Sequence, residues 1–281
     1  MPYTETLFNP DDYWWFSDYR IPELWNMGLS GAGIKIAVPD SGISLPHPDL
    51  NMDPQHVLDV TKATSNGLDT SDGHGTHCTG IIQASYNGLG VTGIAYNASV
   101  YSIKIVDDDT GPSPAFMTAG LRKAMELGVD IISLSQASQK DNADVRKAIA
   151  EALVQGIVVI AAASNKATGT WYPASYEGVL SVAAIDRQKV PLLPQQESRR
   201  DLFAPGRNIY SSDLDMSYKQ RSGSSQATPC VAAVCALLLE AFKKKDIKYT
   251  PAGIRSRILQ RATENIAGVP LIDPYNILKD I

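Results

Sequence analysis

Short runs of consecutive apolar residues alternate along the chain with longer runs in which apolar positions recur every three or four residues. The short runs are rich in Val and Ile and apolar on both faces, which is typical of strands buried on both sides of a parallel sheet. The longer runs have the spacing of amphipathic helices, and Gly128 and Gly156 follow two of them, where a helix C-cap favours glycine. The predicted strands are 34–38, 100–106, 130–135, 157–163 and 179–185, and the predicted helices are 113–127, 142–155, 227–245 and 251–261.

Strands that alternate with helices of this length indicate βαβ units with right-handed crossovers. We therefore predict an α/β fold with a mainly parallel sheet flanked by helices on both faces. The segment 187–201 is polar and interrupted by proline, so we expect a surface loop there rather than a linker. A single domain over residues 1–281 is the expectation, with an N-terminal extension at 1–20 and a core at 21–281.

Composition excludes several classes of protein. A chain of 281 residues with 44% hydrophobic content can bury a large core without disulfides or a structural metal. Its 25 Lys and Arg against 30 Asp and Glu give a net charge of −5, which argues against a nucleic-acid partner. No apolar run of roughly 18 residues is apparent, so we expect no membrane partner. The start of the chain carries acids and aromatics instead of a signal peptide, which leaves the compartment open between the cytoplasm and a mature or excised domain of a secreted protein.

Four stretches carry candidate chemistry, and each also has a plain structural interpretation. Asp40 follows a buried strand, where open α/β sheets place their sites, or it is a turn aspartate. His74 and His77 lie in the glycine-rich sequence DGHGTHCTG before a helix. Asn165 follows the strand 157–163, or it is an ordinary turn asparagine. Ser225, in SGSSQATP at the start of a long apolar helix, is either an N-cap or a nucleophile beside free backbone N–H groups.

Two further motifs do not indicate a cofactor. The HxxH spacing of His74 and His77 suits a zinc pair, but the four histidines and three isolated cysteines supply no paired further ligands. The residues 88–93 match GxGxxG, yet they follow a helix and precede a strand, the reverse of a dinucleotide-binding turn. We therefore expect no cofactor for catalysis.

Taken together, in the chain order Asp, His, Asn, Ser, these stretches resemble the subtilisin-like serine proteases, or subtilases. The resemblance covers nearly the whole chain and includes HPDL at 47–50, HGTH at 74–77, APG at 204–206 and GSSQATP at 223–229. It implies a single-domain subtilisin-like fold with a catalytic core at 21–281. It also implies a serine endopeptidase that takes a protein or peptide as its substrate.

The resemblance assigns roles to the residues that match the family's motifs. Ser225 would be the nucleophile, His74 the general base and then acid, and Asp40 the group that orients His74. Asn165 would bind the oxyanion together with the Ser225 backbone N–H. His77 would pack inside its helix.

The resemblance also implies substrate-binding positions, some of which depart from the family's pattern. Lys166 falls at the rim of the pocket for the side chain before the scissile bond, and Trp171 falls at its floor, where the family has an acid and a small residue. These changes predict small or acidic residues at that substrate position, unless Trp171 points into the core and Lys166 into solvent. The full set of implied substrate-binding residues is Ser135, Gln136, Ala137, Ser164, Lys166 and Trp171.

A structural Ca²⁺ site is implied as well. The matching positions are Asp49 of HPDL, Asn87, and the carbonyl groups of Ser85, Leu89 and Val91. All five offer hard oxygen ligands of the kind that calcium prefers. The alternative is that this loop folds without a metal.

Two other functions remain beside the endopeptidase. A peptide ligase or macrocyclase on the same fold would transfer the acyl group from Ser225 to an amine instead of water, although no water-excluding insertion is apparent. A binding module without activity is disfavoured because all four polar catalytic positions are filled. The sequence does not indicate an oligomeric state.

Overall fold

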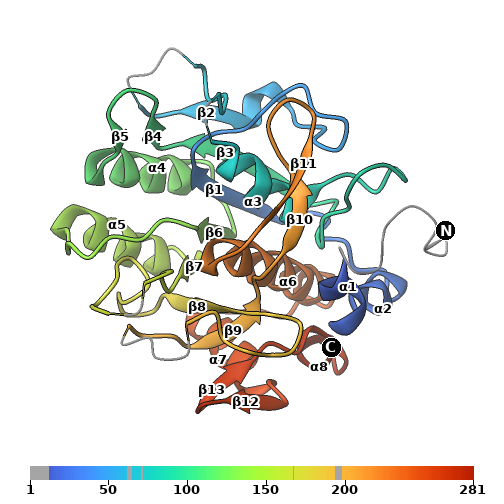
Figure 1. Cartoon of the computed structure of the whole chain (residues 1–281). Coiled ribbons are helices and arrows are strands. Elements are labelled where there is room, and N and C mark those ends of the chain that lie inside the picture. Colours follow the sequence, from blue (N-terminus) through green and yellow to red (C-terminus); the bar gives the residue numbers. More distant parts are fainter. Residues whose placement is uncertain (1–12, 62–64, 71, 167, 194–197) are drawn as a thin grey trace.

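The structure is a computed structural model that describes residues 13–281 except 62–64, 71, 167 and 194–197 (Figure 1). Its strands are β1 (Lys35–Asp40), β2 (Val57–Asp59), β3 (Ser99–Lys104), β4 (Val106–Asp107), β5 (Gly111–Pro112), β6 (Ile131–Leu134), β7 (Val158–Ala162), β8 (Leu180–Ile185), β9 (Leu202–Pro205), β10 (Ile209–Ser212), β11 (Tyr218–Arg221), β12 (Glu264–Ile266) and β13 (Val269–Leu271). Nine of them form one sheet in the order β12-β13-β9-β8-β7-β6-β1-β3-β2, parallel throughout except between β12 and β13. The hairpins β10-β11 and β4-β5 lie outside this sheet.

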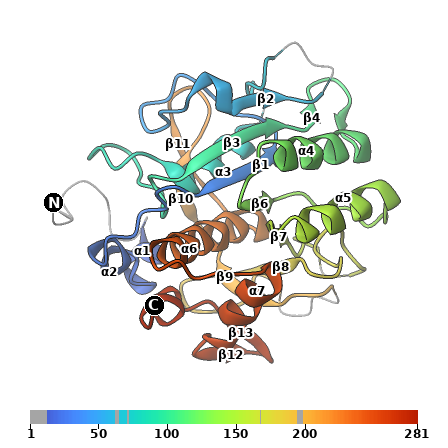
Figure 2. The same cartoon turned by 180° about the vertical axis from the view of Figure 1, so that it is seen from behind.

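Helices cover both faces of the sheet, as Figures 1 and 2 show. α3 (His74–Gln83) and α6 (Ser224–Lys244) pack together on one face, while α4 (Pro114–Glu126) and α5 (Ala143–Val154) pack together on the other. The remaining helices are α1 (Trp14–Asp18), α2 (Ile21–Asn26), α7 (Pro251–Gln260) and α8 (Pro274–Leu278), and a 3₁₀ turn, η1, spans Pro54–His56. The predicted α/β class, with helices on both faces of a mainly parallel sheet, is confirmed.

Successive side chains of the central strands enter two different apolar clusters. Ile36 and Val38 of β1 pack in the cluster that contains α3 and α6, whereas Ala37 between them packs with α4 and α5. Ile131 and Ile132 of β6 divide in the same way. Because side chains alternate across a strand, a sheet covered on both faces needs apolar residues at every position. This is why the strands appear in the sequence as unbroken apolar runs.

All the predicted strands and helices are present, with small shifts at their ends. The predicted strand 100–106 is divided, since β3 ends at Lys104 and β4 begins at Val106. α6 begins at Ser224, three residues before the predicted start. Pro229 lies inside the helix and has no N–H for the carbonyl four residues earlier, that of Ser225.

The described part of the predicted N-terminal extension is built into the core. Tyr13, Trp14, Trp15 and Phe16 are buried and belong to the same apolar cluster as α3 and α6. Residues 1–12 of the predicted extension lie outside the described residues. Within the described residues the folded core therefore includes Tyr13–Phe16, before the predicted start at residue 21.

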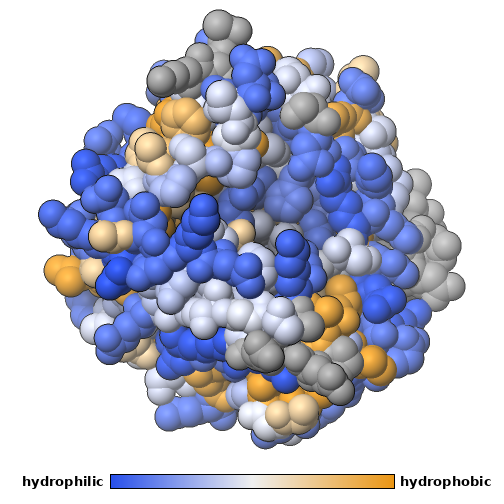
Figure 3. Space-filling model, turned by 60° about the vertical axis from the view of Figure 1, so that its left-hand side comes forward, coloured by the Kyte–Doolittle hydropathy of each residue, from blue (hydrophilic) through white to orange (hydrophobic). Residues whose placement is uncertain are grey.

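One described helix, α6, is long and apolar enough to cross a membrane by length and hydropathy alone. Contrary to the sequence expectation, such a stretch therefore exists, but 89% of its most apolar window is buried inside the structure, as in the core helix of a globular protein. The face of the molecule in Figure 3 is mostly hydrophilic, with apolar residues in small scattered groups.

Candidate active site

The predicted catalytic residues come together at the carboxyl edge of the sheet. Asp40 is the last residue of β1, and Asn165 follows the end of β7. His74 is the first residue of α3 and Ser225 the second residue of α6, so both lie in the first turn of a helix. Hydrogen bonds join the start of α3 to the end of β1, and the start of α6 to the turn after β7. The edge is where open α/β sheets place their ligand sites.

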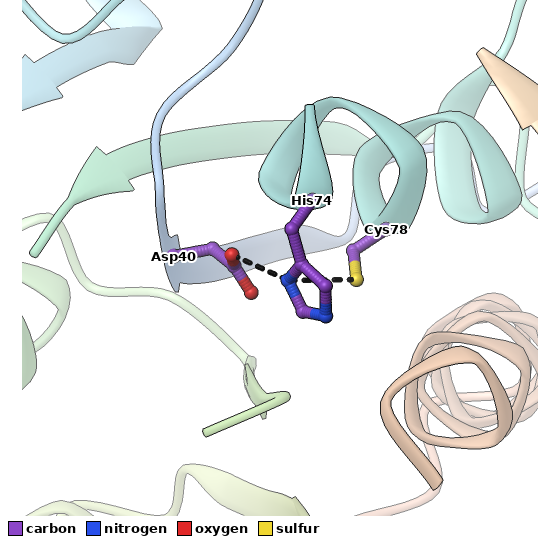
Figure 4. Close-up of side chains that lie close together, drawn as sticks. All are labelled: Asp40, His74 and Cys78. Carbon is purple, nitrogen blue, oxygen red and sulfur yellow. Dashed lines mark hydrogen bonds and ion pairs between the residues drawn. The ribbon is translucent and has the colours of Figure 1, made fainter. Parts of the chain in front are cut away.

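Asp40 and His74 form a buried hydrogen-bonded pair. The His74 Nδ1 atom lies 2.7 Å from Asp40 Oδ1, which also accepts the Ser41 backbone N–H at 2.8 Å (Figure 4). The Asp40 side chain is 1% exposed and that of His74 is 18% exposed. Burial lowers the pKa of His74, while the Asp40 carboxylate and Cys78 together raise it, so that the pKa lies well above the ordinary 6.5. This geometry can hold the imidazole in the tautomer that a general base needs.

Behind this pair lies a second group of polar residues that sequence reasoning missed. The Ser41 hydroxyl donates to Asp69 Oδ2 at 2.8 Å. Lys104, fully buried at the end of β3, donates from Nζ to the Ser41 carbonyl at 2.8 Å and to Asp108 Oδ1 at 2.9 Å. A lysine inside an otherwise uncharged strand was the available signal, because a lysine is almost never fully buried without a partner.

His77 points away from the catalytic pair. Its Nε2 atom lies 3.0 Å from the carbonyl oxygens of both Ile209 and Lys219, so this nitrogen must carry the proton and donate to both. Burial lowers the pKa of His77 to about 3. The expectation that His77 packs inside its helix is confirmed, and the imidazole connects α3 to both strands of the hairpin β10-β11.

Cys78 fills the space beside the His74 ring. Its Sγ atom lies 4.0 Å from His74 Nδ1 and 3.5 Å from the Ser225 carbonyl oxygen (Figure 4). Asp40, His74 and Cys78 are the one set of potential metal ligands that lie close together within the described ranges. Since the set consists of the catalytic pair and the cysteine that packs on it, it does not indicate a separate metal centre.

Ser225 and Ser135 exchange two hydrogen bonds at the centre of the site. The Ser225 hydroxyl donates to the Ser135 carbonyl at 3.2 Å, and the Ser135 hydroxyl donates to the Ser225 carbonyl at 2.8 Å. The second bond is available because Pro229 has no N–H to offer to the Ser225 carbonyl. In the described part of the chain Ser225 makes no hydrogen bond to His74, so its side chain must turn toward the imidazole for proton transfer.

Asn165 faces the start of α6. Its Oδ1 atom accepts the backbone N–H of Ser224 at 2.7 Å and the Ser224 hydroxyl at 2.9 Å. Gly223 passes so close that a Cβ there would lie 2.6 Å from Asn165 Nδ2. The carboxamide is therefore fixed with its oxygen toward Ser224, and its NH₂ group is the end that can donate to a substrate oxygen.

Four of the six predicted substrate-binding residues line two separate cavities. Gln136, Ala137 and Trp171 line a cavity of about 500 Å³, together with apolar residues of α4 and α5. Trp171 is 7% exposed and donates from Nε1 to the Thr168 carbonyl at 2.8 Å. The exposed Lys166 extends over this indole, with Nζ 5.7 Å from the ring centre. Ser164 instead lines a small separate cavity beside Asn165, and Ser135 lies at Ser225 as described above.

The backbone at Ser164 has an unusual conformation. Its φ angle is 132°, in a region that residues other than glycine rarely adopt, and the side chain is buried. The Ser164 hydroxyl accepts the backbone N–H of Lys166 at 3.0 Å, which stabilises the turn that presents Asn165. Backbone strain of about 1–3 kcal/mol at such a position is typical of functional sites.

Two of the predicted calcium-binding positions, Asn87 and Val91, contact the fully buried carboxylate of a third, Asp49. Asp49 is 0% exposed, with Oδ1 3.0 Å from Asn87 Nδ2 and Oδ2 2.6 Å from the Val91 backbone nitrogen. In the described part of the chain Asp49 has no ion-pair partner, and the carbonyls of Leu89 and Val91 accept no hydrogen bond. The Tyr218 hydroxyl also binds Asp49, and the Ser85 carbonyl already accepts the Asn87 N–H at 3.0 Å. The buried anion and the carbonyls of Leu89 and Val91 are oxygen ligands of the kind that Ca²⁺ prefers. Asn87 does not fit, because its Oδ1 atom accepts the Leu89 N–H at 2.9 Å and faces away from Asp49.

Comparisons with known proteins agree with this geometry. The model of the subtilase family matches residues 31–273. Subtilisin Savinase from Lederbergia lenta is 33% identical over 267 residues, which cover 92% of this chain and 96% of the relative. An alkaline protease from Alkalihalobacillus alcalophilus is also 33% identical, over 92% of this chain and 68% of the relative. The minor extracellular protease Epr from Bacillus subtilis is 34% identical over 88% of this chain, which spans 38% of that longer relative.

Proposed function

The chain belongs to the subtilase family and is a subtilisin-like serine endopeptidase, and from this premise we propose that Asp40, His74 and Ser225 are its catalytic triad. The observation that carries this proposal is the 2.7 Å hydrogen bond between His74 and the buried Asp40, beside the helix start that bears Ser225. A serine hydroxyl is a weak nucleophile near neutral pH and needs such an oriented base.

In the proposed mechanism the Ser225 hydroxyl leaves the Ser135 carbonyl and turns to His74 Nε2. His74 takes the proton as Ser225 Oγ attacks the substrate carbonyl carbon, and Asp40 stabilises the imidazolium that forms. The oxyanion receives hydrogen bonds from Asn165 Nδ2 and the Ser225 backbone N–H, at the positive end of the α6 dipole. His74 then protonates the leaving amine, and water, deprotonated by His74, releases the acyl group from Ser225.

The substrate-binding residues are part of the same proposal. Ser135, Gln136 and Ala137 follow β6, where an extended peptide can add to a strand end, and Ser164 shapes the turn at Asn165. Trp171 and Lys166 would contact the side chain before the scissile bond. The indole reduces the room for large side chains, and the ammonium group favours acidic ones.

A fluorophosphonate probe and a peptide library test the triad. Ser225→Ala should abolish both labelling and cleavage, and His74→Ala should reduce both at least about 10³-fold, while near-ultraviolet circular dichroism stays unchanged. Ser222→Ala, on an exposed residue three positions before Ser225, is the matched control and should label normally. Labelling that persists in Ser225→Ala would contradict the assignment. The product masses distinguish hydrolysis from transfer to an amine.

We propose further that the loop at Asp49 binds Ca²⁺ through the Asp49 carboxylate and the carbonyls of Ser85, Leu89 and Val91. The ion would neutralise a buried negative charge and stiffen the loop, with no part in the chemistry. Chelation with EDTA should lower the melting temperature of Ser225→Ala, a background that avoids self-digestion. The variant Asp49→Asn should lose this response, and Asp53→Asn, on a nearby exposed aspartate, should keep it. If neither calcium nor EDTA changes the melting temperature of Ser225→Ala, the proposed calcium site is wrong.

A further inference from the structure

The start of the helix that bears His74 is held by an arginine from a distant strand. α3 has Gly73 as its N-cap, which has no side chain to cap the helix, and the Ser41 hydroxyl accepts the Gly75 N–H at 2.9 Å instead. Arg221, the last residue of β11, adds a second anchor just before the helix: its Nη2 donates to the Asp72 carbonyl and its Nη1 lies 3.3 Å from Asp72 Oδ1. These bonds fix the backbone two residues before His74.

A second carboxylate holds the other edge of the same guanidinium. Arg221 Nε lies 3.1 Å from Asp213 Oδ2, and Nη2 lies 3.0 Å from the same oxygen. The Arg221 side chain is 17% exposed and that of Asp213 is 7% exposed, so these charge-assisted bonds are partly shielded from water. We call Asp72, Asp213 and Arg221 the Arg221 clamp.

The clamp is packed directly against the backbone of Gly73. Gly73 has a φ angle of 76°, and a Cβ at this position would lie 2.2 Å from Asp213 Oδ1 and 3.1 Å from Arg221 Nη2. The carboxylate thus occupies the space that any other residue would need. Since Gly73 is the residue immediately before His74, a shift of the clamp displaces the start of α3.

The clamp also lies on the chain that leads to the nucleophile. β11 ends at Arg221, and Ser225 follows four residues later in the first turn of α6. In Figure 1 the hairpin β10-β11 lies beside α3 and leads into α6. Arg221 therefore joins the backbone before His74 to the backbone before Ser225. The positive charge of Arg221 is paired with the carboxylates of Asp72 and Asp213. The role of Arg221 is therefore to hold these segments together.

We propose that Arg221 is a positioning residue that sets the separation of His74 and Ser225. The inference rests on the proposed triad. Ser225 must leave the Ser135 carbonyl and reach His74 during each turnover, so the reaction depends on where α3 stands relative to α6. A displacement of about 1 Å between reacting groups can cost about 10²-fold in rate.

Chemical rescue of Arg221→Ala provides the test. We expect kcat to fall between about 10-fold and 10²-fold with KM changed less than about 2-fold, and the rate constant of fluorophosphonate labelling to fall in parallel. Methylguanidine at millimolar concentration should restore both rates, because it refills the space between Asp72 and Asp213, whereas methylamine should not. Arg221→Lys should lie between wild type and Arg221→Ala, since an ammonium group cannot make the paired bonds of a guanidinium.

Lys243→Met is the matched control for a purely structural loss. Lys243 pairs with Asp130 near the far end of α6, 2.9 Å from Oδ1, and contacts neither α3 nor Ser225. This variant should lower the melting temperature while its kcat and labelling rate stay at wild-type values. If the Arg221→Ala variant has a lower melting temperature but reacts with the fluorophosphonate at the wild-type rate, the positioning role is wrong. A wild-type protein that does not label at all would instead overturn the proposed triad.

Discussion

Ser224 donates two hydrogen bonds to the Asn165 carboxamide oxygen, one from its backbone N–H at 2.7 Å and one from its hydroxyl at 2.9 Å. An asparagine amide can turn by 180° about its last torsion, which would exchange its oxygen and nitrogen. Two donors on the oxygen prevent this exchange. The residue before the proposed nucleophile thus determines which end of Asn165 faces the substrate.

This relationship predicts graded losses of activity. Asn165→Ala removes the oxyanion donor and should lower kcat by about 10²–10³-fold, the loss measured when the oxyanion-hole asparagine of a subtilisin is replaced. Ser224→Ala keeps the backbone donor but removes the hydroxyl, so we expect a smaller loss, about 3-fold to 10-fold in kcat with KM unchanged. Steady-state kinetics on one peptide ester measure both. In the double variant Asn165→Ala/Ser224→Ala, kcat should be close to that of Asn165→Ala alone, because there is no longer a carboxamide to orient. If the two losses of kcat are instead additive, Ser224 does not act by orienting Asn165.

His74 predicts the pH dependence of the enzyme. Burial lowers the pKa of the imidazole, while Asp40 and Cys78 together raise it, which places the pKa well above 6.5. A general base acts in its neutral form, so kcat/KM should rise with pH and reach half its maximum above pH 6.5. Asp40→Asn removes the main raising charge and should move this midpoint to lower pH. It should also reduce kcat by about 10⁴-fold, as the same substitution of the triad aspartate does in another serine protease. A wild-type midpoint below 6.5 would contradict this account of His74.

His77 predicts the loss of stability in acid. Its pKa is about 3 in the folded protein and near 6.5 when unfolded, so between these values the unfolded chain binds a proton that the folded protein does not. The free energy of unfolding should therefore be highest above pH 6.5 and fall by up to about 4 kcal/mol as the pH drops toward 3. Urea unfolding of Ser225→Ala at pH 4 and pH 7 measures the slope. His77→Gln keeps a donor but cannot titrate, and an equally steep slope in that variant would assign the effect to other groups.

The sequence was sufficient to predict the frame of the sheet, because strands buried on both faces, such as β7 and β8, leave an unambiguous apolar signal. Through the resemblance to the subtilases, the sequence also led to the prediction that Asp40, His74 and Ser225 are the catalytic residues. The short strands β10 and β11 were missed because they are partly polar and are paired through distant contacts.

The missed parts of the site share one cause. Arg221, Lys104 and Ser224 each bind a partner between 59 and 149 positions away, and the sequence around each residue does not identify that partner. The strained backbone of Ser164 is likewise invisible in sequence, because a serine there gives no sign of a positive φ angle. Local periodicity therefore predicts the elements, while long-range polar contacts decide how the site is held.

Trp171 and Lys166 predict the side-chain preference of the enzyme. The indole of Trp171 lines the cavity beside Ala137, and its bond to the Thr168 carbonyl fixes the ring in place. Lys166 lies over that ring with its ammonium group exposed to solvent. Cleavage of a peptide library by the wild type should therefore favour small or acidic residues before the scissile bond over Phe and Tyr.

Substitutions separate the contribution of the indole from that of the charge. Trp171→Gly removes the indole and should raise cleavage after Phe and Tyr by about 10-fold or more, since burial of an aromatic side chain contributes about 1.5–3 kcal/mol. Lys166→Ala should reduce the acidic preference only several-fold, and added salt should do the same to the wild type, because an exposed charge pair contributes about 1 kcal/mol at most. Lys140→Ala removes a cation that lines the cavity away from Lys166 and is the matched control. Strong wild-type selection for Phe or Tyr would show that Trp171 does not limit the pocket. If Lys140→Ala and Lys166→Ala reduce the preference for acidic residues equally, Lys166 does not contact the substrate side chain specifically.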